Sequence, residues 1–319
     1  MSLVFDQLRK RFGTVQALDG ISFNVDPHQV FGFLGANGAG KTTAMRIALD
    51  ILRADSGTVT WQGRDSTELP RRTWGYLPEE RGLYPRMQVL DQLIFFASLY
   101  GIARGEARRE ALAWLARFRI PDYATRRAEE LSKGNQQKVQ FIAAILHDPE
   151  VLIMDEPFTG LDPVNVALLK QAFLEMRDRG KTIVFSTHQM EMAEELCDAV
   201  AIIDHGQLVV SGPTRDVKRE SGKQMVRLAV ADDADIPWLT DVPGVHVTRP
   251  GRDYTELEVA QGVDPESVLE AARQRGERVT LFEIADPTLE QIFVERVGAA
   301  PPSEEERTLA APVAPGAGS

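Results

Sequence analysis

The sequence predicts an α/β protein built on a parallel β-sheet, with an all-helical insertion and a small α+β unit toward the C-terminus. The parallel sheet is predicted by two continuous apolar runs, Val30–Leu34 and Val151–Met154, which are typical of strands buried on both faces. The insertion is predicted at about residues 88–133, where apolar residues recur at helical spacing without a strand-like run. After Gly222 the pattern changes to the short strands and helices of a separate unit.

At the N-terminal end, short strands are expected over Leu3–Arg9 and Gly20–Val25, with a turn at Arg11–Gly13 between them. Phe12 lies in that turn. Its ring could stack on a nucleotide base, or it could pack at the end of a strand like any aromatic side chain. The residues by themselves leave both interpretations open.

The glycine-rich segment Gly35–Thr43 lies between the strand Val30–Leu34 and a helix-like run, Thr42–Leu52. Glycine takes positive φ and has no Cβ, so backbone N–H groups can turn inward around phosphate oxygens at a helix N-terminus, where the macrodipole favours anions. Lys41 would then reach the terminal phosphates, and the Thr42 hydroxyl would bind Mg²⁺. A glycine-rich turn without a ligand is the alternative, which the flanking strand and helix disfavour. The segment therefore predicts a nucleoside triphosphate site.

Two later strands end in polar side chains. The buried run 151–154 is followed by Asp155 and Glu156, and the strand Thr182–Phe185 leads to His188. In a parallel sheet these strand ends face the bound phosphates, and carboxylates at a buried strand end are costly unless they are used. Asp155 is therefore predicted to organise Mg²⁺, and Glu156 to orient or deprotonate a water that attacks the γ-phosphate. His188 could contact the γ-phosphate and sense hydrolysis, or it could be structural, as a lone histidine more often is. A capping role is the alternative for the two carboxylates.

The remaining elements of this unit follow from shorter patterns. Ser132 is placed to cap a helix that opens within Leu131–Lys138, and Gly134 allows close approach of another backbone. A plain helix cap would by itself explain Ser132. Further strands are expected at Gly57–Gly63, Thr73–Leu77, Ala199–Ile203 and Gln207–Val210, the last two joined by a hairpin turn at His205 and Gly206.

Residues 1–222 are thus assigned to one domain and residues 223–298 to an accessory α+β domain. The accessory domain shows no catalytic constellation; it helps the protein to dimerise or regulates it, or else it is a passive extension. The tail, residues 299–319, is expected to be disordered. The expected strands are Gln224–Ala231, Val245–Thr248, Thr255–Val259 and Val279–Ile284, and the expected helices, each with Pro at its first position, are Pro265–Arg275 and Pro287–Val297.

Composition limits the classes of function. The formal net charge of −11 argues against general binding to nucleic-acid phosphates. The longest apolar runs are far too short to span a membrane, and the N-terminus lacks the pattern of a signal peptide. The single cysteine, Cys197, permits no internal disulfide and is expected to pack in the core. We therefore expect a cytoplasmic protein.

The order and spacing of these segments resemble the nucleotide-binding subunit of ATP-binding-cassette (ABC) transporters over about residues 2–220. The resemblance implies a P-loop NTPase core with a β-subdomain and a helical subdomain, ATP and Mg²⁺ as ligands, and ATP hydrolysis coupled to transport. It identifies Gly35–Thr43 with the Walker A loop, Phe12 with the base-stacking aromatic, Glu79 with the Q-loop, Leu131–Gln136 with the signature, Asp155 with the Walker B aspartate, Glu156 with the catalytic glutamate, Thr159–Asp162 with the D-loop and His188 with the switch histidine.

The resemblance further implies two copies arranged head to tail, with each ATP between the Walker A loop of one and the signature of the other. A separately encoded transmembrane permease would complete the transporter, and the protein would lie on the cytoplasmic face of the cell membrane. The implied site consists of catalytic Lys41, Glu156 and His188, nucleotide-binding Phe12, Asn37, Gly38, Ala39, Gly40, Lys41, Thr42, Thr43, Ser132, Gly134, Gln136 and Asp162, and metal-binding Thr42, Glu79 and Asp155.

Three residues depart from the family pattern. Glu79 stands where the Q-loop usually has Gln, and Lys133 and Asn135 stand where the signature usually has Gly and Gln. The stretches 76–85 and 131–146 look most like the bacterial branch of sodium-extrusion and multidrug exporters with a C-terminal accessory domain, so export is expected. The alternative is a soluble ABC ATPase that acts on a macromolecular assembly. The transported substrate is not encoded here, because in this architecture the membrane subunit recognises it.

Overall fold

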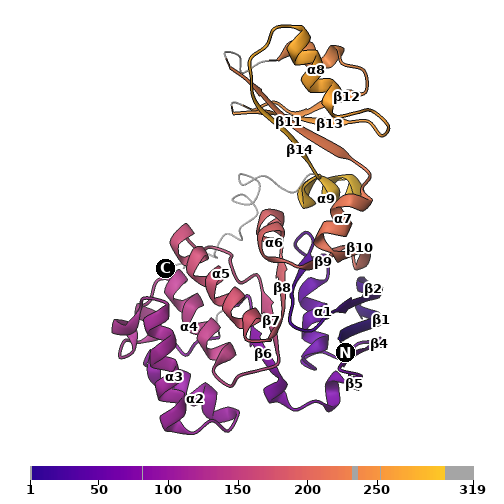
Figure 1. Ribbon diagram of the computed structural model, residues 1–319. Helices are drawn as coiled ribbons and strands as arrows, with labels where there is room; N and C mark the ends of the chain where they lie inside the picture. The colour runs from indigo at the N-terminus through magenta and orange to yellow at the C-terminus, as the bar shows by residue number, and fades with distance from the viewer. Residues whose placement is uncertain (1, 81, 232–235, 252, 299–319) are drawn as a thin grey trace, which may run out of the picture.

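The computed structural model describes residues 2–80, 82–231, 236–251 and 253–298. The predicted disordered tail, 299–319, lies outside these residues. Figure 1 shows a large lower unit and a small upper unit formed by strands β11–β14 and helix α8. The described residues contain no helix that is both long and apolar enough to cross a membrane.

The large unit is organised around a six-stranded sheet in the order β10-β9-β3-β8-β7-β6. Neighbouring strands from β9 to β6 run parallel, and β10 pairs with β9 antiparallel through the predicted hairpin turn. The apolar runs that predicted buried strands are buried along their whole length. The strands are β3 (Val30–Leu34), β6 (Trp74–Leu77), β7 (Val151–Asp155), β8 (Thr182–Thr187), β9 (Ala199–Asp204) and β10 (Gln207–Pro213).

A second, antiparallel sheet with helix α1 (Lys41–Ala48) covers one face of the central sheet. Stacked phenylalanines fill the space between the sheets; the ring centroids of Phe5 and Phe23 lie 4.3 Å apart. Its strands β1 (Leu3–Phe12) and β2 (Val15–Val25) are longer than predicted, so Phe12 ends a strand instead of lying in the turn. Strands β4 (Ser56–Trp61) and β5 (Arg64–Asp65) complete the sheet. Helix α1 is shorter than predicted, because Asp50 takes a positive φ of 52° and ends it.

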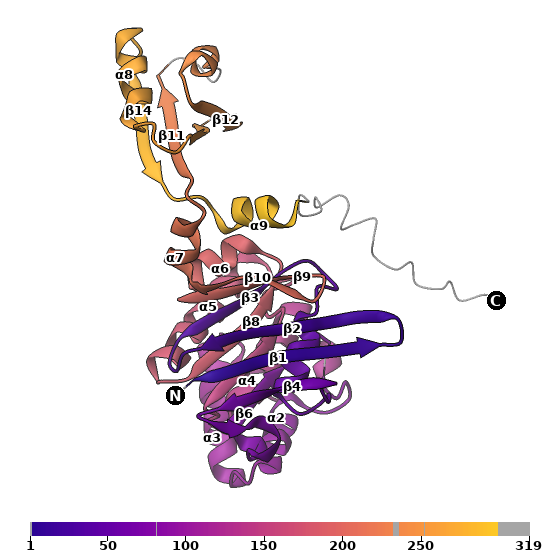
Figure 2. The same cartoon turned by 90° about the vertical axis from the view of Figure 1, so that its right-hand side faces the viewer.

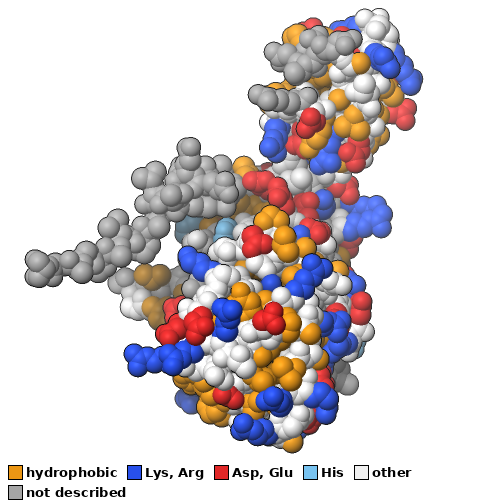
Figure 3. Space-filling model, turned by 90° about the vertical axis from the view of Figure 1, so that its left-hand side faces the viewer, with side chains coloured by type: hydrophobic (Ala, Val, Ile, Leu, Met, Phe, Trp, Pro, Cys, Tyr) orange, Lys and Arg blue, Asp and Glu red, His pale blue; other side chains and the backbone are white. Residues whose placement is uncertain are grey.

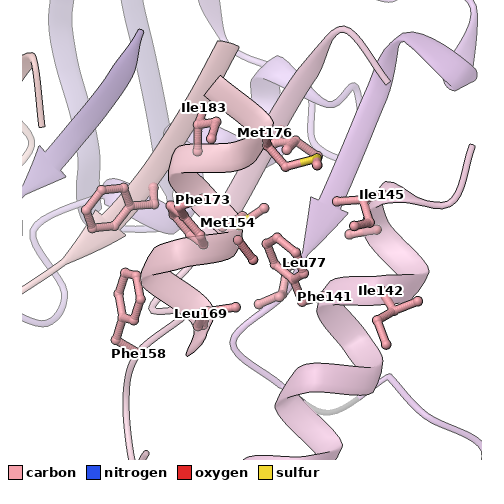
Figure 4. Packing of buried hydrophobic residues seen from close by; sticks show 14 of the residues in the cluster. Leu77, Phe141, Ile142, Ile145, Met154, Phe158, Leu169, Phe173, Met176 and Ile183 are labelled. Atoms are coloured by element: carbon pink, nitrogen blue, oxygen red, sulfur yellow. The ribbon is translucent and has the colours of Figure 1, made fainter. Parts of the chain in front are cut away.

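Helices cover the other face of the central sheet. The predicted helical insertion contains α2 (Val89–Leu99) and α3 (Arg104–Arg117), and α4 (Lys133–Ile145) follows with Ser132 as its N-cap. Figure 4 shows Phe141 of α4 and Phe173 of α5 (Pro163–Asp178) within the core beside Met154 and Leu77 of the sheet. The ring centroids of Phe141 and Phe173 lie 5.8 Å apart. Helices α6 (Met190–Leu196) and α7 (Thr214–Glu220) also belong to this unit.

The small unit is an antiparallel sheet in the order β12-β13-β11-β14, with α8 (Glu266–Gln274) packed on it. Its core contains Val226, Leu257 and Val268. The sequence predicted Pro265 as the first residue of this helix. In the structure Pro265 is instead the N-cap, and α8 begins at Glu266. The strands are β11 (Gln224–Val230), β12 (Val245–Arg249), β13 (Thr255–Val259) and β14 (Val279–Ala285).

The last helix, α9 (Leu289–Val297), belongs to the core of the large unit and not to the accessory sheet. Its buried side chains Leu289, Ile292 and Phe293 join the large core, and Figure 2 shows α9 lying across the top of the large unit. The backbone N–H of Leu289 donates to Glu194 of α6. Helix α9 lies within the predicted accessory domain, residues 223–298, but packs its buried side chains on the large unit. The domain boundaries stay a prediction. The prediction of Pro287 at the first position of α9 is wrong, because Thr288 caps the helix in a capping box with Gln291.

Cys197 is buried directly after α6, as expected for core packing. A Cβ built on Gly32 would lie 2.7 Å from its Sγ, so the neighbouring strand must carry glycine at that point. Burial raises the pKa of the Cys197 thiol well above its ordinary value. The thiol is therefore a packing group without nucleophilic character.

Candidate functional site

The glycine-rich loop is held against the rest of the large unit by close backbone packing. A Cβ on Gly35 would collide with the Ile203 carbonyl oxygen, and one on Gly40 with the Ala17 carbonyl oxygen. Gly40 also has a φ of 111°, in the region that favours glycine, and caps α1. The glycines thus let the loop turn tightly into the start of the helix, as predicted for a phosphate cradle.

Lys41 is buried at the start of α1. Its Nζ donates hydrogen bonds to the carbonyl oxygens of Gly35 at 2.7 Å and Ala36 at 3.1 Å, and lies 3.9 Å from Glu156 Oε1. Burial lowers the pKa of Lys41, while the carboxylates of Glu156, Asp155 and Glu79 raise it. The ammonium group is therefore held inside the loop beside carboxylates, where an anionic ligand can take it as a partner.

The two predicted acidic residues lie at the end of β7, beside the end of β8. Glu156 Oε1 lies 2.9 Å from His188 Nδ1, and the Thr159 hydroxyl donates to Glu156 Oε2 at 3.1 Å. Glu156 has a φ of 47°, a left-handed conformation that is costly for a residue with a side chain. The structure therefore brings Lys41, Glu156 and His188 together, and their catalytic roles stay predictions.

A cavity of about 370 Å³ lies over these groups. It is bounded by the glycine-rich loop, by the end of β7 and by Glu79 from the loop after β6. His188 does not line it and reaches it only through Glu156. The lining residues are Val15, Ala17, Asn37, Gly38, Ala39, Gly40, Lys41, Thr42, Thr43, Glu79, Asp155 and Glu156.

The oxygen donors in this cavity fit Mg²⁺. Asp155 Oδ2 is buried and has no hydrogen-bond partner, which leaves it free for a cation or for a water bound to one. Thr42 and Glu79 add a hydroxyl and a carboxylate at the same cavity. In the described part of the chain no three His, Cys, Asp or Glu side chains cluster in a way that could hold a metal. A magnesium ion here would therefore depend on phosphate oxygens of its nucleotide, which is how Mg²⁺ is usually bound in such sites.

Phe12 lies at the tip of the hairpin of β1 and β2, beside the phosphate cavity. Its side chain is 48% exposed, and Lys10 Nζ lies 5.6 Å from the centre of its ring. Val15, its pairing partner across the hairpin, lines the cavity. The exposed ring is not packed as a core aromatic, and its contact with a base stays a prediction.

The predicted signature and D-loop residues lie at two helix starts and do not line the cavity. The Ser132 hydroxyl caps α4 by accepting from Asn135 N at 3.4 Å, and Asp162 caps α5. A Cβ on Gly134 would lie 2.6 Å from the Asn165 side-chain amide, so a larger residue there would displace that amide. The side-chain amide of Gln136 donates a hydrogen bond to the carbonyl oxygen of Ala128 at 2.9 Å. The nucleotide contacts of these residues stay predictions.

Sequence reasoning missed three contributors to this site. Val15 and Ala17 carry no chemical signal, and they line the cavity only because the hairpin folds over the loop. Thr159 was placed in the D-loop, but its hydrogen bond to Glu156 was not anticipated. A threonine three residues after the predicted catalytic carboxylate, at a chain reversal, is the signal that could have found it.

Glu79 should make the stability of the nucleotide-free protein pH-dependent. Although the side chain is exposed, loss of surrounding water and the nearby charges of Asp155 and Glu156 raise its pKa above the ordinary 4.5. The ionised form of Glu79 is therefore less favourable in the folded than in the unfolded protein. The free energy of unfolding falls as the pH rises through the pKa values of Glu79 in the two states. We expect Glu79→Gln to raise the unfolding temperature at pH 8, with the gain shrinking toward pH 4. Thermal unfolding of both proteins across this range checks it.

The matched control for that measurement is Glu106→Gln, which removes an exposed carboxylate from α3, outside the cavity lining. A gain for Glu79→Gln that is the same at pH 4 and pH 8 would contradict the charge argument.

Two family models match the chain. Residues 18–159 match the model described as ABC transporter, and residues 212–297 match the model described as ATP-binding protein DrrA1-3-like, C-terminal domain. The first match ends just after the strand that carries Asp155 and the residue that follows it, Glu156. The second covers the accessory sheet and α9.

Relatives and solved structures agree with these matches. The chain is 44% identical over 297 residues to an uncharacterized ABC transporter ATP-binding protein, YhaQ, of Bacillus subtilis (strain 168), covering 93% of this chain and 99% of the relative. It is 36% identical over 234 residues to a Nod factor export ATP-binding protein I of Paraburkholderia xenovorans (strain LB400), covering 71% and 76%. A solved structure of the ATP binding subunit of an ABC transporter superimposes with a TM-score of 0.65 at 30% identity, covering 70% of this chain and 94% of that one.

Proposed function

Because this chain belongs to the family of ABC transporter ATP-binding proteins and is an ATPase of that family, we propose that it works as a head-to-tail dimer that binds two Mg²⁺-ATP and drives a separately encoded membrane permease. The direction of transport in this proposal is export, as in the relative whose name records Nod factor export. The dimer would act at the cytoplasmic face of the membrane.

The observation that carries the proposal is the division of the predicted site. The Walker A loop and the acidic residues after β7 share one cavity, whereas Ser132 and Gly134 stand away from its lining. The copy of the protein that binds a nucleotide in this cavity would therefore leave part of the phosphates uncovered. This supports completion of the site by the signature segment of a second copy.

Within one copy, the residues have complementary tasks. Thr42, Asp155 and Glu79 would hold Mg²⁺, which, when bound, neutralises charge on the phosphates. Lys41 would exchange its carbonyl partners for phosphate oxygens. Glu156 would accept a proton from the attacking water, while His188 and Thr159 fix its two carboxylate oxygens.

A groove near the loop of Glu79 fits the expected contact with the permease. It has a volume of about 210 Å³ and lies between this loop, α2 and α4, with Leu83, Phe96 and Leu99 among its lining residues. Leu99 is 65% exposed, and the rings of Tyr84 and Phe95 are also exposed nearby. A short apolar helix of a membrane partner would cover these side chains.

The surface on the helical side of the protein does not favour a soluble ABC ATPase that acts on nucleic acid. In Figure 3 the Lys and Arg side chains on this side are scattered among acidic and hydrophobic ones, and the described residues seen in this view form no continuous basic area. A phosphate backbone needs such an area to bind.

The proposal is tested by purifying the Glu156→Gln protein with Mg-ATP from solubilised native membranes and identifying what accompanies it. We expect stoichiometric recovery of a multi-span membrane protein. Leu99→Glu, made in the same background, should lose that protein, because it places a charge in the apolar groove. Recovery of soluble partners only would contradict the transporter assignment and support a soluble ABC ATPase acting on a macromolecular assembly.

Ile51→Glu is the matched control for the groove variant. Ile51 is 56% exposed and lies after α1, outside the groove, so its replacement introduces the same charge elsewhere on the surface. Loss of the membrane protein from both variants would show that the groove is not the contact.

A further inference from the structure

Ser186 connects the two acidic residues of the site, although it does not line the cavity. It lies on β8 directly opposite Asp155 in the parallel pairing of β7 and β8. Its hydroxyl donates to Asp155 Oδ1 at 2.6 Å and accepts the backbone N–H of Glu156 at 3.0 Å. The side chain is completely buried. One hydroxyl group thus makes hydrogen bonds to two successive residues of the neighbouring strand end.

The first of these bonds determines which oxygen of Asp155 is free. Asp155 is almost fully buried, and Oδ1 is occupied by the Ser186 hydroxyl. Oδ2 has no partner. The serine therefore fixes the rotation of the carboxylate and leaves a single, defined oxygen for a cation or its water.

The second bond fixes the backbone at the catalytic glutamate. Glu156 departs from β7 with a φ of 47°, a conformation that persists only where surrounding contacts enforce it. The hydroxyl of Ser186 is the partner of its N–H. Without that partner the buried N–H would lose its hydrogen bond, and the turn that aims the glutamate would lose an anchor.

We propose that Ser186 is a positioning residue of the ATPase site: it sets the carboxylate of Asp155 for Mg²⁺ and the backbone of Glu156 for its role as base. This inference rests on the proposed Mg²⁺-ATP site. Since His188 directly follows β8, two residues after Ser186, the same strand end fixes the metal-facing carboxylate, the base and the histidine that contacts the base.

The test uses the full-length Ser186→Ala protein and a fluorescent ATP analogue, titrated with Mg²⁺ from an EDTA-buffered start. A hydrogen bond to a charged group contributes about 1.5–3 kcal/mol, so the Mg²⁺ concentration for half-maximal nucleotide binding should rise roughly tenfold to a hundredfold. Nucleotide affinity in EDTA should be unchanged, because Ser186 lies outside the cavity lining. Ser186→Thr, which keeps the hydroxyl, should restore most of the Mg²⁺ response.

Thr182→Val provides the matched control. Thr182 lies on the same strand and is equally buried, and its hydroxyl likewise accepts one backbone N–H at 3.0 Å, that of His28. Its loss should lower the unfolding temperature without moving the Mg²⁺ midpoint. If the alanine variant does not fold, Ser186→Cys replaces it in the test. Cysteine keeps a similar side-chain volume but is a weaker hydrogen-bond donor, so the Mg²⁺ midpoint should shift in the same direction.

A midpoint for Ser186→Ala within twofold of the parent, or an equal shift in Thr182→Val, would overturn the role of Ser186. These outcomes leave the nucleotide site itself standing. The proposed function fails separately, if the parent protein binds no nucleotide analogue at any Mg²⁺ concentration.

Discussion

Glu156→Gln should retain ATP but hydrolyse it about 10²- to 10⁴-fold more slowly, the usual loss when a general base is removed. The amide keeps the size of the carboxylate and can still accept from Thr159, so the end of β7 should keep its shape. It cannot take a proton from water. It also leaves Lys41, 3.9 Å away, with less negative charge around it, so ATP affinity should be equal or higher. Single-turnover hydrolysis and equilibrium nucleotide binding measure the two effects separately.

The same variant should form a stable dimer with ATP, because hydrolysis is the step that would reopen the interface. Light scattering with ATP, with ADP and without nucleotide measures this. Glu175→Gln on α5 is a suitable control, since it removes a carboxylate that pairs with arginines away from the cavity. Hydrolysis within tenfold of the parent would contradict the role of Glu156 as base. A protein that stayed monomeric with ATP would contradict the head-to-tail dimer instead.

Lys41→Ala should abolish tight ATP binding. The ammonium group lies inside the glycine-rich loop and is positioned to bind phosphate oxygens. Each hydrogen bond to a charged group contributes about 1.5–3 kcal/mol, so loss of this side chain should weaken binding by at least roughly tenfold to a hundredfold. Isothermal titration of the purified variant with Mg-ATP checks the prediction.

Two further variants separate charge from packing. Lys41→Met keeps most of the aliphatic chain and should be as defective as Lys41→Ala. Lys181→Ala removes a largely buried lysine that also bonds a backbone carbonyl, that of Asp148, and should leave binding intact. ATP affinity of Lys41→Met close to that of the parent would contradict direct contact between the ammonium group and phosphate.

Several features of the site could be predicted from the sequence because each is encoded by adjacent residues. The strand, loop and helix around Gly35–Thr43 are consecutive in the chain, and Asp155 and Glu156 directly follow a recognisable buried strand. A parallel sheet places such strand ends at one edge, so their convergence follows from the pattern alone. The role of Ser132 as a helix cap was predictable for the same reason.

Other features depended on surfaces that are distant in the sequence. Helix α9 shows an ordinary amphipathic pattern, which specifies that it buries a face but not against which partner. Its partner is α6, where Glu194 binds the N–H of Leu289 from 95 residues away. The hairpin that brings Val15 to the cavity likewise depends on the second sheet folding over the loop.

The sequence by itself determined the α/β class, the phosphate loop, the acidic strand end and the helical insertion, because periodicity and local turn chemistry act between neighbouring residues. Only the tertiary structure decided that α9 joins the large core, that Ser186 connects Asp155 with Glu156, and that Ser132 and Gly134 stand away from the cavity. These features depend on which surfaces meet when the sheets and helices pack. That choice reflects the combined burial and hydrogen bonding of many residues and is not written in any one segment.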